Sequence, residues 1–248
     1  MLLSGKIVAP YTGSVRSYRF IDVITALFVT TLLLSNVASS AKIIDWGVSL
    51  FGLQLAFDAG TLLFPVSYIL GDVLTEVYGY ARARRVIWIG FGCAALMSAL
   101  FWLIAHMPGE AQWQEYAGDA AYNAILGSVG NGAIIAASLL AYLLGEFSNS
   151  FVLAKMKVWM SGRKLWMRTI GSTLVGQALD TSAFILLATA LGVFPWSLAL
   201  SLIVANYIFK VGIEAAFTPV TYAVVGFLKR NEKEDFYDKE TNFSPFKI

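Results

Sequence analysis

Residues Leu62 to Arg85 read LLFPVSYILGDVLTEVYGYARARR, a stretch that is apolar enough to enter a membrane yet contains two carboxylates and ends in arginines. Asp72 and Glu76 are one helical turn apart, so on a helix they share a face. An ionised side chain at the centre of a membrane helix costs about 2.5 to 3.5 kcal/mol on insertion scales. The stretch therefore predicts a membrane helix that turns its acidic face toward the protein interior.

The composition of the whole chain also indicates a membrane protein. Its 248 residues are 58% hydrophobic and 14% charged, with one Cys and one His, and the mean hydropathy is +0.68. These values lie outside the usual range of soluble domains. One Cys excludes an intrachain disulfide, and one His with one Cys excludes the common Cys/His zinc sites. The net charge of +2 is too small to indicate nucleic-acid binding.

Six apolar stretches are long enough to cross a bilayer, whose hydrocarbon core of about 30 Å needs roughly 20 helical residues. They are expected at 20–39, 60–79, 86–106, 128–154, 168–191 and 198–228. Between the first two, residues 42–60 alternate in polarity and are rich in glycine, which favours a short hairpin or re-entrant segment over a seventh span. The sequence thus predicts an all-α membrane protein with six transmembrane helices.

The basic residues indicate on which side each connection lies. Of the 18 Lys and Arg residues, all but Lys42 and Lys210 precede the first span or follow the second, fourth and sixth. The positive-inside rule then places both termini in the cytoplasm, as an even number of spans requires. The first span also resembles a signal peptide, but its apolar run is longer than usual and its removal would break the charge alternation.

The same pattern divides the chain into three parts. Residues 1–19 form a cytoplasmic segment, 20–228 a six-helix transmembrane domain, and 229–248 a charged cytoplasmic tail. On its composition, the tail is expected to be a short disordered extension.

Polar residues inside the expected spans point to a common interior. Five acids there face a single lysine, Lys210. Such an excess of buried negative charge needs protons, an arginine such as Arg168, a metal ion or a cationic ligand. Helical spacing also groups the acids with amides on shared faces. The residues expected to line a binding cavity are Asp72, Glu76, Glu146, Asn149, Gln177, Asp180, Asn206, Lys210 and Glu214.

The chemistry of this set suits a planar, donor-rich heterocycle. A carboxylate can accept two parallel hydrogen bonds from a guanine-like N1–H and NH₂, while Asn or Gln satisfies the ring oxygen. The aromatic side chains expected in the cavity wall are Phe64, Tyr68, Phe147 and Phe184. A structural alternative stays open, in which the polar groups are hydrogen-bonded pairs that hold helices together.

Three motifs carry a resemblance to a known family. The stretches FPVSYILGDVLTEVYGYARARR, GEFSNSFVLAKMK and RTIGSTLVGQALDTSAF occur in this order. They are similar to the signature of the queuosine precursor transporter family of bacterial inner-membrane proteins, over about residues 19–226. The resemblance implies uptake of 7-cyano-7-deazaguanine and 7-aminomethyl-7-deazaguanine, used to make queuosine in tRNA. It also implies a six-helix fold similar to the substrate-binding subunits of energy-coupling-factor transporters.

Family positions coincide with most of the expected site. The resemblance places there Asp72, Glu76, Glu146, Asn149, Arg168, Gln177 and Asp180. We expect Glu146 or Asp180 to pair with the guanine-like edge and Gln177 or Asn149 to bind its oxygen. Asp72 and Glu76 are then expected to meet the aminomethyl cation or coupling protons.

Other functions stay open on the sequence. A substrate-capture subunit for another small heterocycle or vitamin would need a separate ATP-driven module, because the chain has no GxxxxGK[ST] loop. An intramembrane enzyme would use paired carboxylates as acid and base, but nucleophile and cofactor motifs are absent from the sequence. A structural scaffold would make five buried acids a costly choice.

We therefore expect a transporter with no catalytic residues, cofactor or metal site. Its expected partners are a purine-like small molecule and the lipid bilayer, with oligomerisation and an energising partner left open.

Overall fold

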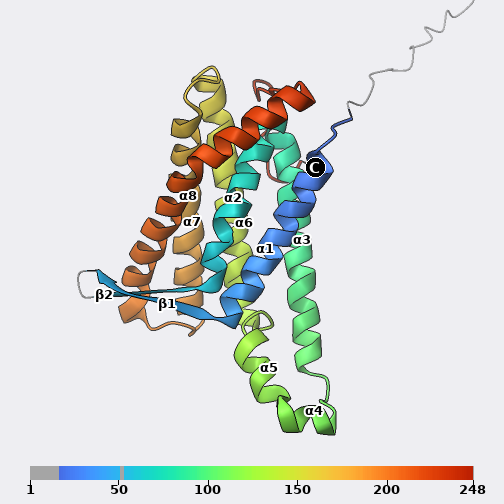
Figure 1. The fold of residues 1–248 in the computed structure, drawn as a ribbon, viewed down its shortest axis with the longest axis vertical. Helices are drawn as coiled ribbons and strands as arrows, with labels where there is room; N and C mark the ends of the chain where they lie inside the picture. Colours follow the sequence, from blue (N-terminus) through green and yellow to red (C-terminus); the bar gives the residue numbers. More distant parts are fainter. Residues whose placement is uncertain (1–16, 51–52, 248) are drawn as a thin grey trace, which may run out of the picture.

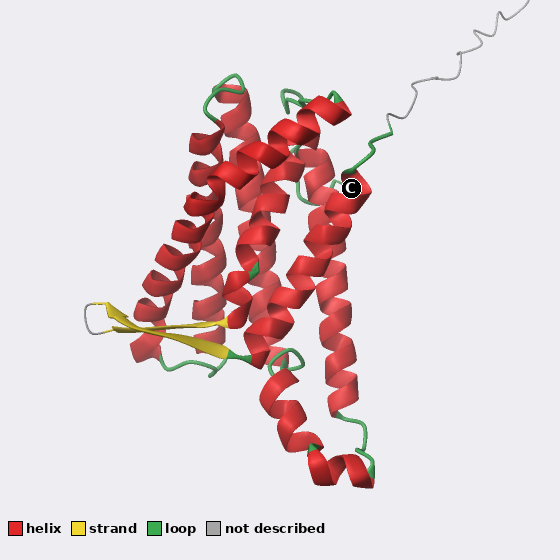
Figure 2. Ribbon diagram, viewed as in Figure 1, coloured by secondary structure: helices red, strands yellow, loops and turns green. Residues whose placement is uncertain are grey.

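The computed structural model describes residues 17–50 and 53–247 and is helical apart from one two-stranded hairpin (Figure 2). In chain order its elements are α1 Ile21–Ala41, β1 Ile43–Leu50, β2 Leu53–Asp58, the 3₁₀ turn η1 Ala59–Leu62, α2 Phe64–Val73, the π-helical turn η2 Leu74–Tyr78, α3 Tyr80–Ala105, α4 Ala111–Tyr116, α5 Gly118–Leu126, α6 Gly132–Trp159, α7 Leu165–Ala190 and α8 Trp196–Glu232. The N-terminal basic residues Lys6 and Arg16 lie outside the described residues.

Five helices in the described part of the chain are long and apolar enough to cross a membrane: α1, α3, α6, α7 and α8. They correspond to five of the six expected spans. The expected span 60–79 is helical but shorter, since α2 has 10 residues and η2 has 5, or about 22 Å at 1.5 Å per residue. All of η2 and most of α2 are buried. This segment is an interior element, which is why it can carry carboxylates.

The long helices run in alternating directions between two ends of the molecule (Figure 1). The beginning of α1 and the C terminus lie at one end, which we call the tail end, together with the turn between α6 and α7. The β1–β2 hairpin and the short helices α4 and α5 lie at the other, which we call the hairpin end. The predicted hairpin is confirmed, with Ile43 opposite Asp58 and Leu50 opposite Leu53 in an antiparallel pair.

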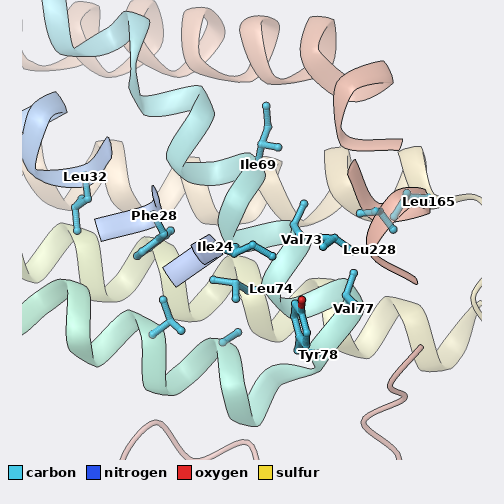
Figure 3. Packing of buried hydrophobic residues seen from close by; sticks show 13 residues of the cluster. Ile24, Phe28, Leu32, Ile69, Val73, Leu74, Val77, Tyr78, Leu165 and Leu228 are labelled. Atoms are coloured by element: carbon cyan, nitrogen blue, oxygen red, sulfur yellow. The ribbon is translucent and has the colours of Figure 1, made fainter. Parts of the chain in front are cut away.

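The hydrophobic core surrounds α2 and η2 (Figure 3). Helix α1 contributes Ile24, Phe28 and Leu32, whose spacing of four residues places them on one face. This face packs against Val73 and Leu74, and α8 adds Leu228 from the tail end. Packing on several sides fixes the position of the acidic segment within the bundle.

The composition of the tail after α8 predicted a disordered extension, and this prediction is wrong. The tail folds back onto α3. Both carboxylate oxygens of Asp238 accept hydrogen bonds from the backbone N–H of Tyr80, at 3.1 and 3.2 Å. The Arg84 guanidinium donates to the carbonyl oxygens of Asn242 and Ser244. The first N–H groups of a helix have no partners within the helix, so the start of α3 offers donors that a charged tail satisfies.

Candidate substrate-binding site

A cavity of about 590 Å³ lies among α1, α2, α3, α6, α7 and α8. This volume is in the range of small-molecule sites. The cavity extends toward the hairpin end, because Ser39 and Ser40 near the end of α1, and Ser128 after α5, line it. Four of the nine expected site residues are in its wall: Glu146, Asp180, Asn206 and Lys210.

Two glycines allow α6 and α7 to pack closely, which brings the acids of the two helices next to each other. A Cβ atom placed on Gly145 would lie 2.7 Å from the Cβ of Asp180, and one on Gly176 would lie 2.8 Å from the Cβ of Asn149. Only glycine allows the two backbones to approach so closely. Because Glu146 follows Gly145 directly, this contact places Glu146 and Asp180 in one wall of the cavity.

The charged groups of the cavity differ in their partners. Asp180 forms an ion pair with Lys210 at 2.8 Å, and the Lys210 ammonium lies 5.2 Å from the ring centroid of Phe64. Glu146 is 2% exposed, and its Oε2 atom has no hydrogen-bond partner among the described residues. That oxygen packs against Gly71, 3.2 Å from where a Cβ would stand. The cavity therefore presents one unpartnered carboxyl group next to one neutralised acid–base pair.

The aromatic wall is largely as expected. Phe64, Tyr68 and Phe184 line the cavity. Phe147 does not, and its ring instead lies 5.8 Å from that of Trp88 on α3. Successive helical residues point about 100° apart, so the neighbour of a cavity-facing Glu146 turns away from the cavity.

Some cavity residues had no signal in the sequence. The hydroxyl oxygens of Ser67 and Thr181 are buried without a hydrogen-bond partner in the described part of the protein, and both residues line the cavity. Tyr142, Asn36 and Phe194 line it as well. Uncharged side chains of these types are common in membrane helices for packing reasons, so only their position identifies them.

Asp72, Asn149, Gln177 and Glu214 lie behind the cavity wall. Asp72 accepts a hydrogen bond from the Asn149 amide at 2.8 Å, and Glu214 accepts one from the Thr173 hydroxyl. Both carboxylates border a second pocket between α2, α7 and α8, which is too small to hold a water molecule. The side-chain oxygens of Asn149 and Gln177 have no partner among the described residues.

Glu76, which was expected to act with Asp72, belongs to a separate ion-pair network at the tail end. The helix changes from α to π between the two residues. Glu76 is fully buried, and its carboxylate contacts Arg168, Lys229 at 2.6 Å and Lys157 at 3.5 Å. We call Glu76 and these three cations the Glu76 cluster. Arg168, one of several counter-charges that the sequence had left open, contacts Glu76, whereas the sequence had marked Lys157 and Lys229 only as indicators of orientation.

The tail completes this cluster through Asp235. Its carboxylate contacts Lys157 at 2.5 Å and Lys229 at 2.8 Å, and its side chain is 43% exposed. Partial burial acts to raise the pKa of Asp235, but the hydrogen bonds from Lys157 and Lys229 outweigh it and lower the pKa below its usual value. The folded tail is therefore held to the bundle by charge as well as by backbone contacts.

Membrane-length helices around an internal cavity of ligand size, lined by apolar and polar side chains, define a multi-pass membrane protein. Residues 58–224 match the family described as "Putative vitamin uptake transporter". The chain is 30% identical over 190 residues to the "Probable queuosine precursor transporter" of Bacillus subtilis (strain 168), covering 75% of this chain and 78% of the relative. It is 27% identical over 203 residues to the "Queuosine precursor transporter" of Escherichia coli (strain K12), covering 81% and 86%.

No solved structure has significant similarity to the chain. The chain belongs to the queuosine precursor transporter family, as its three motifs predicted. It is a transport protein and not an enzyme.

Proposed function

We propose that this protein imports the queuosine precursors 7-cyano-7-deazaguanine and 7-aminomethyl-7-deazaguanine across the bacterial inner membrane, for the modification of tRNA. The observation that carries the proposal is Glu146, a carboxyl group in the wall of a ligand-sized cavity whose Oε2 has no partner among the described residues. A buried acceptor of this kind is costly unless a ligand supplies its hydrogen bonds. The names of both relatives point to the same class of substrate.

The cavity offers complementary groups for a 7-deazaguanine. The Glu146 carboxylate accepts the parallel hydrogen bonds of N1–H and the exocyclic NH₂, since two oxygens in one plane match two donors. Lys210 donates to the ring carbonyl oxygen, Asp180 receives the aminomethyl cation, and Asn206 lies beside them. The rings of Phe64 and Phe184 provide the apolar surfaces on which the flat heterocycle packs. Gln177 and Asn149 act from behind the wall, by holding its acidic residues in place.

The proposal includes a topology of six crossings with both termini in the cytoplasm. It is supported by the alternating course of the helices, in which α2 and η2 provide the second passage (Figure 1). It is also supported by the basic residues at the tail end, among them Arg82, Lys155 and Arg163. The implied similarity to the substrate-binding subunits of energy-coupling-factor transporters belongs to this proposal as well, while an energising partner and a homo-oligomer stay open. The transport domain then includes the folded tail.

The test is the queuosine content of tRNA in a bacterial host that cannot synthesise the precursors. With a low external concentration of either precursor, the gene is expected to restore queuosine, whereas Glu146→Gln and Asp180→Asn are expected to abolish restoration. Glu115→Gln is the matched control, because Glu115 is an exposed carboxylate on α4. Failure of the unaltered protein to restore queuosine, despite expression in the membrane, would refute the proposed substrates. Uptake in a host without energy-coupling ATPases would exclude the need for such a partner.

A further inference from the structure

The polar residues of the bundle form three successive layers between the hairpin end and the tail end. Along α8, Lys210 lines the cavity, Glu214 borders the small pocket and Lys229 joins the Glu76 cluster. Along α2 and η2, Tyr68, Asp72 and Glu76 occupy the same three layers in the same order. Asp72 and Glu214 therefore lie between the cavity and the Glu76 cluster, inside the part of the bundle that closes the cavity from the tail end.

The middle layer has acceptors but no cation. Asp72 is 1% exposed and Glu214 5% exposed. Of the residues that the structure describes, no lysine or arginine forms an ion pair with either carboxylate. Each has one hydrogen-bond donor that the structure shows, from Asn149 and Thr173 respectively. Two ionised carboxylates in so dry a place would repel each other and be poorly solvated.

Asn149 indicates what is missing from this layer. Its amide nitrogen donates to Asp72, and the oxygen of the same amide, fully buried, has no partner among the described residues. This acceptor belongs to the same side chain that contacts Asp72, and an O–H group would supply the donor that it lacks. A protonated carboxyl group provides such a donor, and it needs no additional room in a pocket that is too small for water. A hydrated metal ion does not meet that condition.

We propose that Asp72 and Glu214 form a proton-binding site, separate from the substrate cavity, at which the binding of one proton couples transport to the proton gradient. The inference rests on the proposed function only for the choice of the transported substrate. The carboxyl pair is the site of the coupling ion, and Asn149 and Thr173 are positioning residues that orient the two carboxyl groups through hydrogen bonds.

The charged groups around the pair favour a bound proton. Asp72 faces Glu214 from α8 and Glu76 from η2, and Glu214 also faces Glu146 from α6. All of these are acids. Glu76 is neutralised within its own cluster, and Lys210, one turn from Glu214 on α8, is paired with Asp180. Among the described residues, no neighbouring cation is therefore left to replace the proton.

The proton follows a complete path in this scheme. It arrives through the cavity from the hairpin end and binds one oxygen of the pair, which keeps the layer between α2, α7 and α8 closed. When the bundle opens toward the tail end, water reaches the pair, the O–H bond breaks and the proton leaves to that water. The pair then carries two negative charges, so it closes again only after a new proton has bound.

The first experiment uses the full chain in proteoliposomes with labelled 7-aminomethyl-7-deazaguanine. An inward proton gradient is expected to accelerate uptake, and Asp72→Asn and Glu214→Gln are expected to lose this acceleration while the label still exchanges across the membrane. Glu115→Gln is expected to behave like the unaltered protein. Exchange by the unaltered protein with no effect of the proton gradient, or with acceleration by a sodium gradient instead, would overturn the proton site and leave the proposed function standing.

Absence of any exchange by the unaltered protein would refute the proposed substrate, and a second measurement then decides about the proton site. Infrared spectroscopy of the purified protein separates the C=O stretch of a protonated carboxyl group from the carboxylate bands. At neutral pH we expect a protonated carboxyl signal that decreases in both Asp72→Asn and Glu214→Gln. An identical signal in the unaltered protein and in both variants would show that the pair holds no proton.

Discussion

Glu76 and Glu146 are both buried glutamates in the same bundle, yet their surroundings are opposite. Glu76 is contacted by three cations, whereas Glu146 lines a cavity and is contacted by no cation of the described residues. A buried carboxylate with cations on several sides contributes to structure, and removing a partner leaves a buried charge exposed to its full desolvation cost. We propose that a buried carboxyl group that lines a cavity and has no partner among the described residues contributes to binding. The surroundings of the two glutamates therefore distinguish a structural role from the proposed binding role, which the residue type alone does not.

Removing a cation from the Glu76 cluster is expected to give the largest effect. Arg168→Ala should lower the free energy of unfolding by about 3 to 5 kcal/mol, the usual cost of breaking a buried ion pair. The measurement is chemical or thermal unfolding of the detergent-solubilised protein. Arg163→Ala, an exposed arginine in the turn before α7, should change it by less than about 0.5 kcal/mol. Equal stability of the two variants would contradict the structural role that we assign to the Glu76 cluster.

Removing the charge of Glu146 is expected to affect binding and not stability. Hydrogen bonds to charged groups contribute about 1.5 to 3 kcal/mol, so Glu146→Gln should weaken precursor binding by about 10- to 150-fold. Calorimetric titration of the purified protein with precursor measures the dissociation constant, and unfolding of the same sample measures stability. A large loss of stability with unchanged binding would assign Glu146 the role that we give to Glu76.

Packing of the tail is expected to have a smaller effect on stability. Gly79 has φ +87°, and a Cβ placed on it would lie 2.3 Å from the Phe236 ring. Gly79→Ala should therefore cost about 1 to 3 kcal/mol through backbone strain and overlap. The control is Gly92→Ala, because nothing lies within 4 Å of a Cβ at that position on α3. If both variants melt at the same temperature, the contact between Phe236 and Gly79 does not hold the tail.

Asp235 is expected to give the smallest effect, and one that depends on pH. Its pKa is lowered in the folded protein, so its contribution to stability is present above the unfolded pKa of about 3.9 and is lost as the pH falls through the folded pKa. Since the side chain is 43% exposed, Asp235→Asn should cost about 1 kcal/mol or less at neutral pH. Unfolding at neutral and acidic pH should show that difference disappear. Glu240→Gln, an exposed neighbour in the tail, should show no such pH dependence.

The sequence predicted the membrane class, the hairpin and the family, and five of its six expected spans correspond to membrane-length helices. Each of these follows from local properties, namely apolar length, alternation of polarity and contiguous motifs. It also identified the buried acids Asp72, Glu76, Glu146 and Glu214, because the cost of a charge inside a membrane is high at any position in the fold. It did not predict the folded tail. Composition shows that the segment is poor in hydrophobic residues, but it does not show which groups elsewhere in the protein can bind the segment. The hydrogen bonds of Arg84 and Asp238 between the start of α3 and the tail have no local signature.

The sequence by itself determined that acids occur within membrane helices and must be compensated, because the desolvation penalty of a charge is a property of the charged group itself. Only the tertiary structure decided how each acid is compensated. Asp72 and Glu76 are one turn apart in the chain, yet one meets an amide from α6 and the other meets cations from α6, α7 and α8. The physical reason is that electrostatic interactions depend on distances in space. Close contacts such as that between Gly145 and Gly176 bring together segments that are far apart along the chain, and the sequence does not reveal these contacts.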